Sequence, residues 1–268
     1  MSIPTYESNS FLDAVVDAVR RHNGLNRKQV IAAIRRFVDP SDPIHGPGDD
    51  AAIIQIGDQQ IVACGEAISP PFVNSDPYGA GTAAIVANVN DIAAMGGVPR
   101  GIVNTVIGPR EVTTEVMRGL SDAAQIYDIP IIGGHLTERD GDTSLSAFAI
   151  GVAQRVLTMA NLRPGQVLLF ACSLDGEMRS DYPFFTSIKR QRATLARDVR
   201  LLAEVAASGA AIAAKDVSMP GPLGSLAMLL EFRRCGAKVD MRKLPMPAFT
   251  DPLRWLVSFP TYGFWLAA

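Results

Sequence analysis

Cysteine is scarce in this sequence. Its 268 residues include only Cys64, Cys172 and Cys235, and none of them belongs to a C-x-x-C pair. An odd and scattered set of cysteines argues against a disulfide framework and against a structural zinc site. The polar stretch at residues 1–10 also lacks the apolar segment of a secretion signal. We therefore expect a cytoplasmic protein whose cysteines stay reduced.

The sequence also has little charge of either sign and no long hydrophobic run. Charged residues make up 19% of the chain, and 25 Lys and Arg against 27 Asp and Glu leave a net charge of −2. This balance gives no general attraction to nucleic acid or to an anionic membrane. The basic stretch 189–200 has no interleaved aromatic residues and favours a solvated face. Apolar runs such as Val167–Cys172 are too short to span a bilayer.

Several common catalytic motifs are missing. The chain has no G-x-x-x-x-G-K-[ST] phosphate loop, no G-x-S-x-G elbow, no H-E-x-x-H pair and no G-x-G-x-x-G fingerprint. Their absence argues against the common P-loop ATPases, serine hydrolases, zinc peptidases and dinucleotide enzymes.

Glycine and proline, in contrast, are plentiful, with 23 and 18 residues, and the length predicts roughly 1.8 domains. Apolar periodicity and turn residues predict helices and strands in alternation through about residue 155. The predicted helices are 10–22, 26–38, 79–97 and 111–127. The predicted strands are 51–56 and 60–64, joined by a turn at Gly57–Asp58, followed by 102–107, 131–132 and 145–153.

A boundary is predicted near Leu162–Gly165, where Arg-Pro-Gly precedes a new apolar strand. The remaining predicted elements are a strand at 166–172, helices at 194–208 and 223–235, and an apolar run at 255–268. The last run stops in what reads as a strand, which suggests an exposed apolar edge.

The first candidate site is the loop His45-Gly46-Pro47-Gly48-Asp49-Asp50. Adjacent carboxylates on a glycine-bearing loop suit a hard cation and leave room for a phosphate. An ordinary turn is the alternative, since glycine and aspartate are common turn residues.

The second candidate lies inside the apolar helix predicted at 79–97, where Asn88, Asn90 and Asp91 interrupt alanine, valine and isoleucine. Buried polar groups are costly unless they are hydrogen-bonded or bind a metal. The sequence leaves both interpretations open: a ligand site, or a hydrogen-bonded polar group in the core.

The third candidate is Gly133-Gly134-His135-Leu136-Thr137, which follows a short predicted strand. Paired glycines allow a ligand to approach the backbone, and His135 could contact metal, phosphate or base. A structural histidine is the alternative.

The fourth candidate is Lys215-Asp216 with Ser218, just before the glycines that open the helix predicted at 223–235. Charged residues between a strand and a helix N-terminus suit an anionic ligand or substrate. A solvated loop is the alternative.

In order and spacing, three of these motifs resemble the aminoimidazole ribonucleotide (AIR) synthetase (PurM)-related superfamily. They are Gly48-Asp49-Asp50-Ala51-Ala52, the string from Asn88 through Asn90-Asp91-Ile92-Ala93-Ala94-Met95-Gly96-Gly97 to Pro99, and Gly133-Gly134-His135. The superfamily includes thiamine-monophosphate kinase, selenophosphate synthetase and the hydrogenase maturation protein HypE. The resemblance runs from about residue 40 to the end and points to an uncharacterised AIR synthase-related branch.

The resemblance implies a two-domain fold of mixed α+β and α/β type. A helical segment at 1–40 would precede an ATP- and Mg²⁺-binding domain at 41–158, whose sheet pairs across a homodimer to close a β-barrel. A C-terminal α/β domain at 159–268 would follow in incomplete form. ATP and Mg²⁺ are the implied cofactors and a small molecule the implied substrate, with no nucleic acid or membrane partner.

The resemblance also implies roles for individual residues. Asp49, Asp50 and Asp91 would bind Mg²⁺, with Glu66 as a further ligand. The nucleotide would contact Gly48, Asn88, Asn90, Gly133, Gly134, His135 and Thr137. Asp216, with Lys215, would face the acceptor substrate as the catalytic pair.

This sequence departs from the superfamily in ways that leave the acceptor open. Glu66 stands where many members carry aspartate, and His135 matches the selenophosphate synthetase branch, whereas kinase-like members have aspartate there. That branch's glycine-rich segment with cysteine and lysine, and the cysteine tail of HypE, are both missing.

Three functions therefore remain. The first is Mg²⁺-dependent, kinase- or ligase-type activation of a small carbonyl, amide or phosphate compound by ATP. The second is a nucleotide-binding sensor or scaffold without turnover. The third is thiamine-monophosphate kinase itself.

Overall fold

A computed structural model describes residues 9–28, 30–34, 37 and 48–268. Their contacts divide the chain into two units. The large-sheet unit comprises residues 50–157 and 193–210. The two-sheet unit comprises residues 1–49, 158–192 and 211–268. Among the described residues, no helix combines the length and hydropathy needed to cross a membrane.

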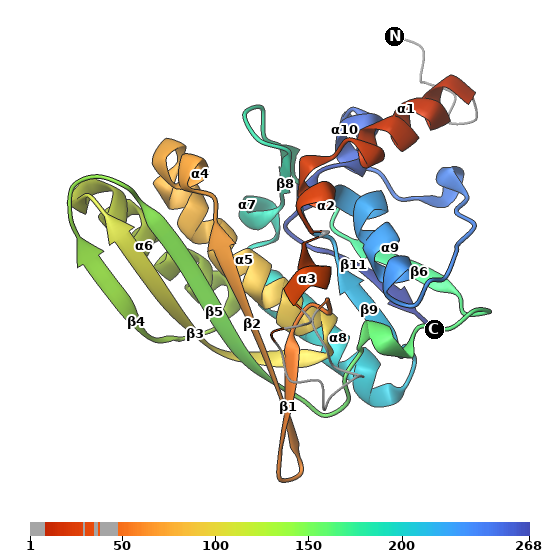
Figure 1. Cartoon of the computed structure of the whole chain (residues 1–268), viewed down its shortest axis with the longest axis horizontal. Coiled ribbons are helices and arrows are strands. Elements are labelled where there is room, and N and C mark those ends of the chain that lie inside the picture. The colour runs from red at the N-terminus through yellow and green to blue at the C-terminus, as the bar shows by residue number, and fades with distance from the viewer. Residues whose placement is uncertain (1–8, 29, 35–36, 38–47) are drawn as a thin grey trace. The chain divides into compact units, whose positions relative to one another are not determined.

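The large-sheet unit is built on five strands in the order β1-β2-β5-β3-β4 (Figure 1). Only β3 and β4 run parallel, and the other neighbours are antiparallel. The strands are β1 (Ala52–Ile56), β2 (Gln59–Ile68), β3 (Gly97–Gly108), β4 (Ile131–Glu138) and β5 (Ser144–Ala153). The helices are α4 (Pro70–Ser75), α5 (Pro77–Ala94), α6 (Arg110–Tyr127) and α8 (Leu195–Ser208).

The sequence predicts most of this unit correctly. The hairpin at Gly57–Asp58 forms, with Ile56 opposite Gln59. The helix predicted at 79–97 is α5, which ends at Ala94 because Gly96 adopts a left-handed φ of +74° and β3 starts at Gly97.

The short strand predicted at 131–132 is an underestimate, because β4 continues through both glycines to Glu138. Gly134 lies opposite Asn104 of β3, and a Cβ on Gly134 would come within 2.5 Å of the Asn104 carbonyl oxygen. The glycine pair is therefore part of an edge strand and not a loop after it, since only glycine allows this close approach.

The two faces of the five-stranded sheet differ in exposure. On β5, Leu145, Ala147 and Ala149 are buried on the face that α5 covers, whereas Phe148 and Ile150 on the opposite face are exposed. This alternation follows from the two-residue period of a strand. This opposite face, hereafter the uncovered face, also carries the exposed residues Ile54, Ile56 and Ile132.

Helices α5 and α6 pack closely through two glycines. A Cβ on Gly81 would collide with the carbonyl oxygen of Val116, and a Cβ on Gly119 would collide with that of Tyr78. The small residues that make α5 apolar on all sides thus let it lie between the sheet and α6, where most of its residues are buried.

The two-sheet unit contains two three-stranded sheets, ordered β6-β11-β9 and β10-β8-β7. Its strands are β6 (Leu168–Cys172), β7 (Glu177–Met178), β8 (Phe184–Thr186), β9 (Ala213–Asp216), β10 (Phe259–Pro260) and β11 (Gly263–Ala267). Its helices are α1 (Asn9–Arg20), α2 (Asn23–Lys28), α3 (Ile31–Ile34), α7 (Ile188–Gln191), α9 (Gly221–Phe232) and α10 (Pro252–Leu256), with short 3₁₀ turns at Met159–Asn161 and Met241–Lys243.

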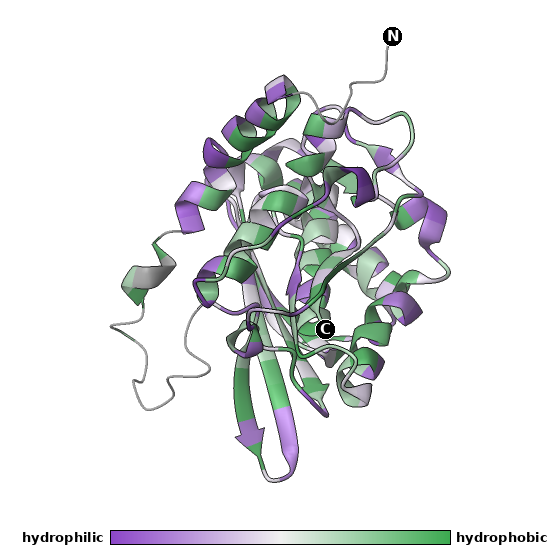
Figure 2. Cartoon of the chain, turned by 90° about the vertical axis from the view of Figure 1, so that its right-hand side faces the viewer, coloured by the Kyte–Doolittle hydropathy of each residue, from purple (hydrophilic) through white to green (hydrophobic). Residues whose placement is uncertain are grey.

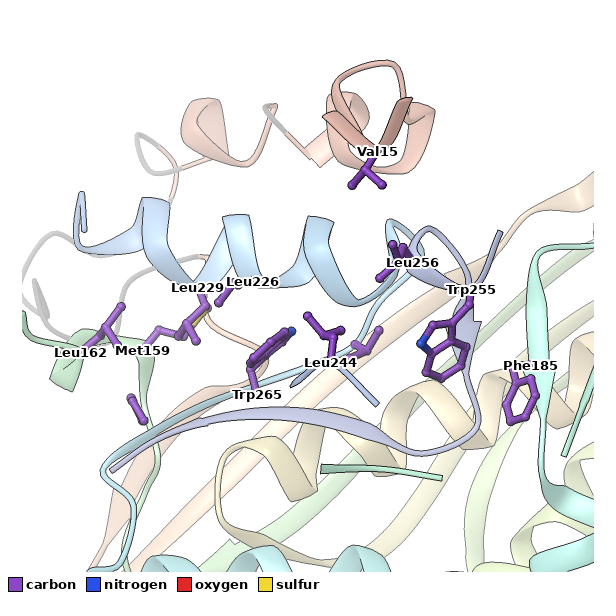
Figure 3. Close-up of a cluster of buried hydrophobic side chains, with 13 residues drawn as sticks. Val15, Met159, Leu162, Phe185, Leu226, Leu229, Leu244, Trp255, Leu256 and Trp265 are labelled. Atoms are coloured by element: carbon purple, nitrogen blue, oxygen red, sulfur yellow. The ribbon is translucent and has the colours of Figure 1, made fainter. Parts of the chain in front are cut away.

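The described part of the helix predicted at 26–38 forms two short helices, α2 and α3. Helix α1 alternates between hydrophilic and hydrophobic residues (Figure 2). Its buried residue, Val15, belongs to the same apolar cluster as Trp255, Trp265 and Leu256 (Figure 3). The amphipathic pattern of α1 therefore matches its packing.

The prediction that the C-terminal apolar run leaves an exposed strand edge is wrong. Strand β11 is the middle strand of its sheet, paired with β6 on one side and β9 on the other, and all five of its residues are buried. Trp265 of β11 stacks on Phe170, and its indole N–H donates to the Pro222 carbonyl at 2.7 Å. The apolar run is a core strand and needs no partner to cover it.

Candidate functional site

Two carboxylates meet in the large-sheet unit. Asp91 is buried on the last turns of α5, and Asp50 is half-buried two residues before β1. A carboxylate oxygen of Asp50 lies within 4.8 Å of one of Asp91. Two oxygens at this separation can share one small cation, and carboxylate oxygens are the ligands that Mg²⁺ prefers. The donor set present therefore fits magnesium.

Asn88 lies three residues before Asp91 on α5, and its amide is fully buried. Its Nδ2 donates to the carbonyl oxygens of Ala84, at 2.8 Å, and Ala147, at 3.2 Å. Its Oδ1 accepts from the Cys64 thiol at 3.3 Å. These bonds use the Asn88 side chain to tie α5 to β2 and β5. Asn90 is equally buried.

Cys64 on β2 was not among the predicted site residues. Burial is the main cause of its raised pKa, and the negative charges of Asp91, Glu66 and Asp50 raise the pKa further. The thiol therefore stays protonated and unreactive near neutral pH. Glu66, two residues further along β2, contributes its charge to the same environment. No sequence signal links Cys64 to Asn88, because 24 residues separate them.

Asp49 belongs to the two-sheet unit, where its carboxylate accepts bonds from the Thr158 hydroxyl and from the Met159 backbone N–H at 3.1 Å. These contacts hold the 3₁₀ turn at Met159–Asn161. Gly48 has a left-handed φ of +123°, and a Cβ there would touch the Phe232 ring at 3.4 Å. The other residues of the predicted loop, 45–47, lie outside the described part of the chain.

Gly133, Gly134, His135 and Thr137 are all on edge strand β4. His135 Nε2 lies 3.0 Å from Thr137 Oγ1, and both side chains lie on the uncovered face of the sheet, opposite Thr105 and Ile107. Because His135 is exposed, a ligand arriving at this edge can reach it.

A buried polar cluster forms at the end of β9 in the two-sheet unit. Lys215 Nζ donates to the Asp216 carboxylate and to Ser218 Oγ, the latter at 3.0 Å. Ser218 Oγ donates to Asp216 at 3.0 Å, and the Ser218 N–H donates to Ser225 Oγ on α9 at 2.8 Å. Lys215 and Asp216 are almost fully buried, at 1% and 2% exposure.

Opposing effects act on the pKa of Asp216. Burial, the largest effect, raises it. The positive charges of Lys215 and Lys28, together with hydrogen bonds from Lys215 and Ser218, outweigh burial and bring the pKa below its ordinary value. Asp216 is therefore a buried, ionised carboxylate held by a neighbouring ammonium.

The sequence of this chain is similar to a known protein family and to several known proteins. The family described as "AIR synthase related protein, N-terminal domain" matches residues 48–153. An uncharacterised protein of Methanocaldococcus jannaschii is 32% identical over 269 residues, which cover 96% of this chain and 83% of that protein. A selenide, water dikinase of Myxococcus xanthus is 32% identical over 239 residues, covering 82% of this chain and 66% of the relative.

A solved structure, AaThiL complexed with AMPPCP and TMP, has a similar fold. Its TM-score is 0.67 at 17% sequence identity, and the match covers 89% of this chain and 83% of that one. The fold, the spacing of the acidic motifs and the sequence relatives agree. This chain belongs to the AIR synthase-related (PurM-related) superfamily.

Proposed function

We propose that this protein binds ATP together with Mg²⁺ and transfers a phosphoryl group to a small acceptor carrying a carbonyl, amide or phosphate group. The observation that carries this proposal is the pairing of the Asp50 and Asp91 carboxylates within 4.8 Å. Both residues lie in the segment that matches the AIR synthase-related N-terminal domain.

The relatives support a reaction that uses ATP. The Myxococcus xanthus protein is named a dikinase, and the AaThiL structure holds AMPPCP, an ATP analogue. Magnesium, when bound, would neutralise charge on the transferred phosphate. Asp50 and Asp91 would hold it, with Glu66 as a further ligand. The residues proposed to contact the nucleotide are Gly48, Asn90, Gly133, Gly134, His135 and Thr137, with Asn88 supporting them from within α5.

The Lys215–Asp216 pair is proposed to serve the acceptor. Because its pKa is lowered, the Asp216 carboxylate is a weak base. It is better suited to accept a hydrogen bond from the acceptor, and so to orient it, than to remove its proton. Lys215 would keep this carboxylate ionised, and Ser218 would fix its direction.

The uncovered face of the five-stranded sheet is proposed to pair with the same face of a second copy and to close a β-barrel. Five large apolar side chains on this face are exposed: Ile54, Ile56, Ile132, Phe148 and Ile150. Several large apolar side chains exposed on one face of a sheet are typical of an interaction surface. A symmetric homodimer would bury the patch against itself.

Calorimetric titration with ADP and with AMPPCP, each with and without Mg²⁺, tests the proposal. We expect binding that requires Mg²⁺ and that Asp50→Asn and Asp91→Asn each weaken by at least about tenfold, since each variant removes a charged metal ligand. Asp58→Asn, in the exposed hairpin turn, is the matched control and should bind like the wild type. Equal binding by all four proteins would refute the metal site.

A nucleotide sensor without turnover is the second candidate, and Glu66 and His135 favour it as departures from the kinase-like pattern. ADP release separates the two functions. Steady ADP release with any acceptor from a metabolite panel would exclude the sensor. Thiamine monophosphate belongs in that panel, because a null result with it removes thiamine-monophosphate kinase as the third candidate.

A further inference from the structure

We propose that Cys64 is a positioning residue for the metal site: its thiol holds the Asn88 amide, and that amide fixes the part of α5 that presents Asp91. The inference rests on the proposed function, in which Asp91 holds magnesium. It assigns a role to a side chain that is itself neither a ligand nor a nucleophile.

The Asn88 amide contacts three elements. Its Nδ2 donates to Ala84 within α5 and to Ala147 on β5. Two carbonyl acceptors on one side require the NH₂ group to face them, which turns Oδ1 toward β2. There the Cys64 thiol donates to Oδ1 at 3.3 Å and also approaches the Asn88 backbone oxygen at 3.5 Å. Cys64 is thus the side-chain donor that completes the set.

Asp91 is fixed by contacts on both sides of it along α5. Asn88, three residues earlier, is bonded to the sheet as described. Ile92, one residue later, packs so closely on the sheet that a Cβ on Gly151 would come within 2.4 Å of its side chain. Removing the Cys64 contact would detach the Asn88 side chain from β2 and leave its bond to Ala147 to hold it to the sheet, while the Ile92 contact stays intact. The Asp91 carboxylate would then shift with the helix turn that carries it.

A hydroxyl can replace the thiol, but a methyl group cannot. Cys64→Ser keeps a donor toward Oδ1, whereas Cys64→Ala leaves that buried oxygen without its donor and opens a space beside α5. A control for general loosening of the sheet is Ile102→Val on β3. Ile102 is fully buried, lies opposite Ala149 on β5, and has no side-chain group that can donate a hydrogen bond to Asn88.

The experiment measures Mn²⁺ affinity by electron paramagnetic resonance, with Mn²⁺ replacing Mg²⁺, on full-length protein that circular dichroism shows to be folded. We expect Cys64→Ala to weaken Mn²⁺ binding by about tenfold, the scale usual for residues that support metal ligands. The Mn²⁺ affinity of Cys64→Ser should stay within about threefold of the wild-type affinity. Ile102→Val should bind like the wild type even where its melting temperature falls.

A second measurement follows the side-chain amide of Asn88 by NMR in metal-free protein. Its hydrogen exchange should accelerate in Cys64→Ala and remain slow in Cys64→Ser. Equal Mn²⁺ affinity in wild type and Cys64→Ala, or unchanged exchange, would overturn this inference and leave the proposed function standing. A wild type that binds no Mn²⁺ would refute the proposed metal site, and this inference with it.

Discussion

Lys215 and Asp216 are adjacent in the sequence, yet their side chains form an ion pair that is almost completely buried at the end of β9. Successive strand residues normally point to opposite faces. Ser218 receives a bond from Lys215 and gives one to Asp216, so it binds both members of the pair. The paired charges, together with the hydroxyl, make this cluster tolerable inside the unit.

Removing one charge of this pair should destabilise the protein strongly. Lys215→Met leaves a buried carboxylate without its main counter-charge and should lower the free energy of unfolding by about 3–5 kcal/mol. The double variant Lys215→Met/Asp216→Leu should recover most of this loss, since no buried charge remains. Urea denaturation of the wild type, both single variants and the double variant gives the coupling energy. Additive losses would contradict the pairing.

The free energy of unfolding should fall at acidic pH because the Asp216 carboxylate becomes protonated. Because its pKa is lowered on folding, the unfolded chain binds more protons near pH 4, and acid therefore favours unfolding. The contribution should be complete above the unfolded value of about 4 and disappear as pH falls toward the lower native value. Between about pH 5 and about pH 2, the free energy of unfolding of Asp216→Asn should depend less steeply on pH than that of the wild type. Chemical denaturation at a series of pH values measures both slopes.

Two carboxylates at the surface also titrate in this range. A hydrogen bond from Arg179 holds the pKa of Asp181 at about 2, and one from Arg242 does the same for Asp240. Both groups are present in the wild type and in Asp216→Asn, so their effects cancel in the comparison. The same pH slope in the two proteins would show that Asp216 does not carry the acid sensitivity.

Asp49 should contribute to stability through its bonds at the 3₁₀ turn Met159–Asn161. Asp49→Asn weakens the bonds to Thr158 and Met159 and should lower the free energy of unfolding by about 1–3 kcal/mol. Asp50→Asn should reduce Mg²⁺-dependent nucleotide binding more than Asp49→Asn does. Chemical denaturation and calorimetry on both variants check the pair. Loss of metal-dependent binding with unchanged stability in Asp49→Asn would instead make Asp49 a ligand.

A charge on the uncovered sheet face should prevent dimerisation. Phe148→Asp combined with Ile150→Asp places two carboxylates in the apolar patch, where a partner face would have to desolvate them. Light scattering coupled to size exclusion should report a dimer for the wild type and a monomer for this variant. Leu201→Asp, at an exposed apolar position on α8, should remain a dimer. A monomeric wild type would remove the proposed β-barrel.

Local sequence patterns predict much of the secondary structure of the large-sheet unit. Period-two alternation and the Gly57–Asp58 turn predict the β1–β2 hairpin, and the small apolar residues of α5 predict a buried helix. These features depend on residues close in sequence. The same locality explains the error at β4, where the glycine pair reads as the end of a strand. Pairing with β3 keeps the backbone extended through Gly133 and Gly134.

The order of the acidic and glycine motifs, a property of the sequence alone, was enough to identify the superfamily. The motif order could not show which polar residues form hydrogen bonds that hold the fold and which face a ligand. The bonds of Asp49 to Thr158 span 109 residues, and the Cys64–Asn88 contact joins β2 to α5 across 24. Burial and hydrogen-bond geometry arise only when distant segments pack, because each polar group must then find a partner inside the fold. The sequence thus determined which chemistry is available, and the tertiary structure decided which side chains pair with one another.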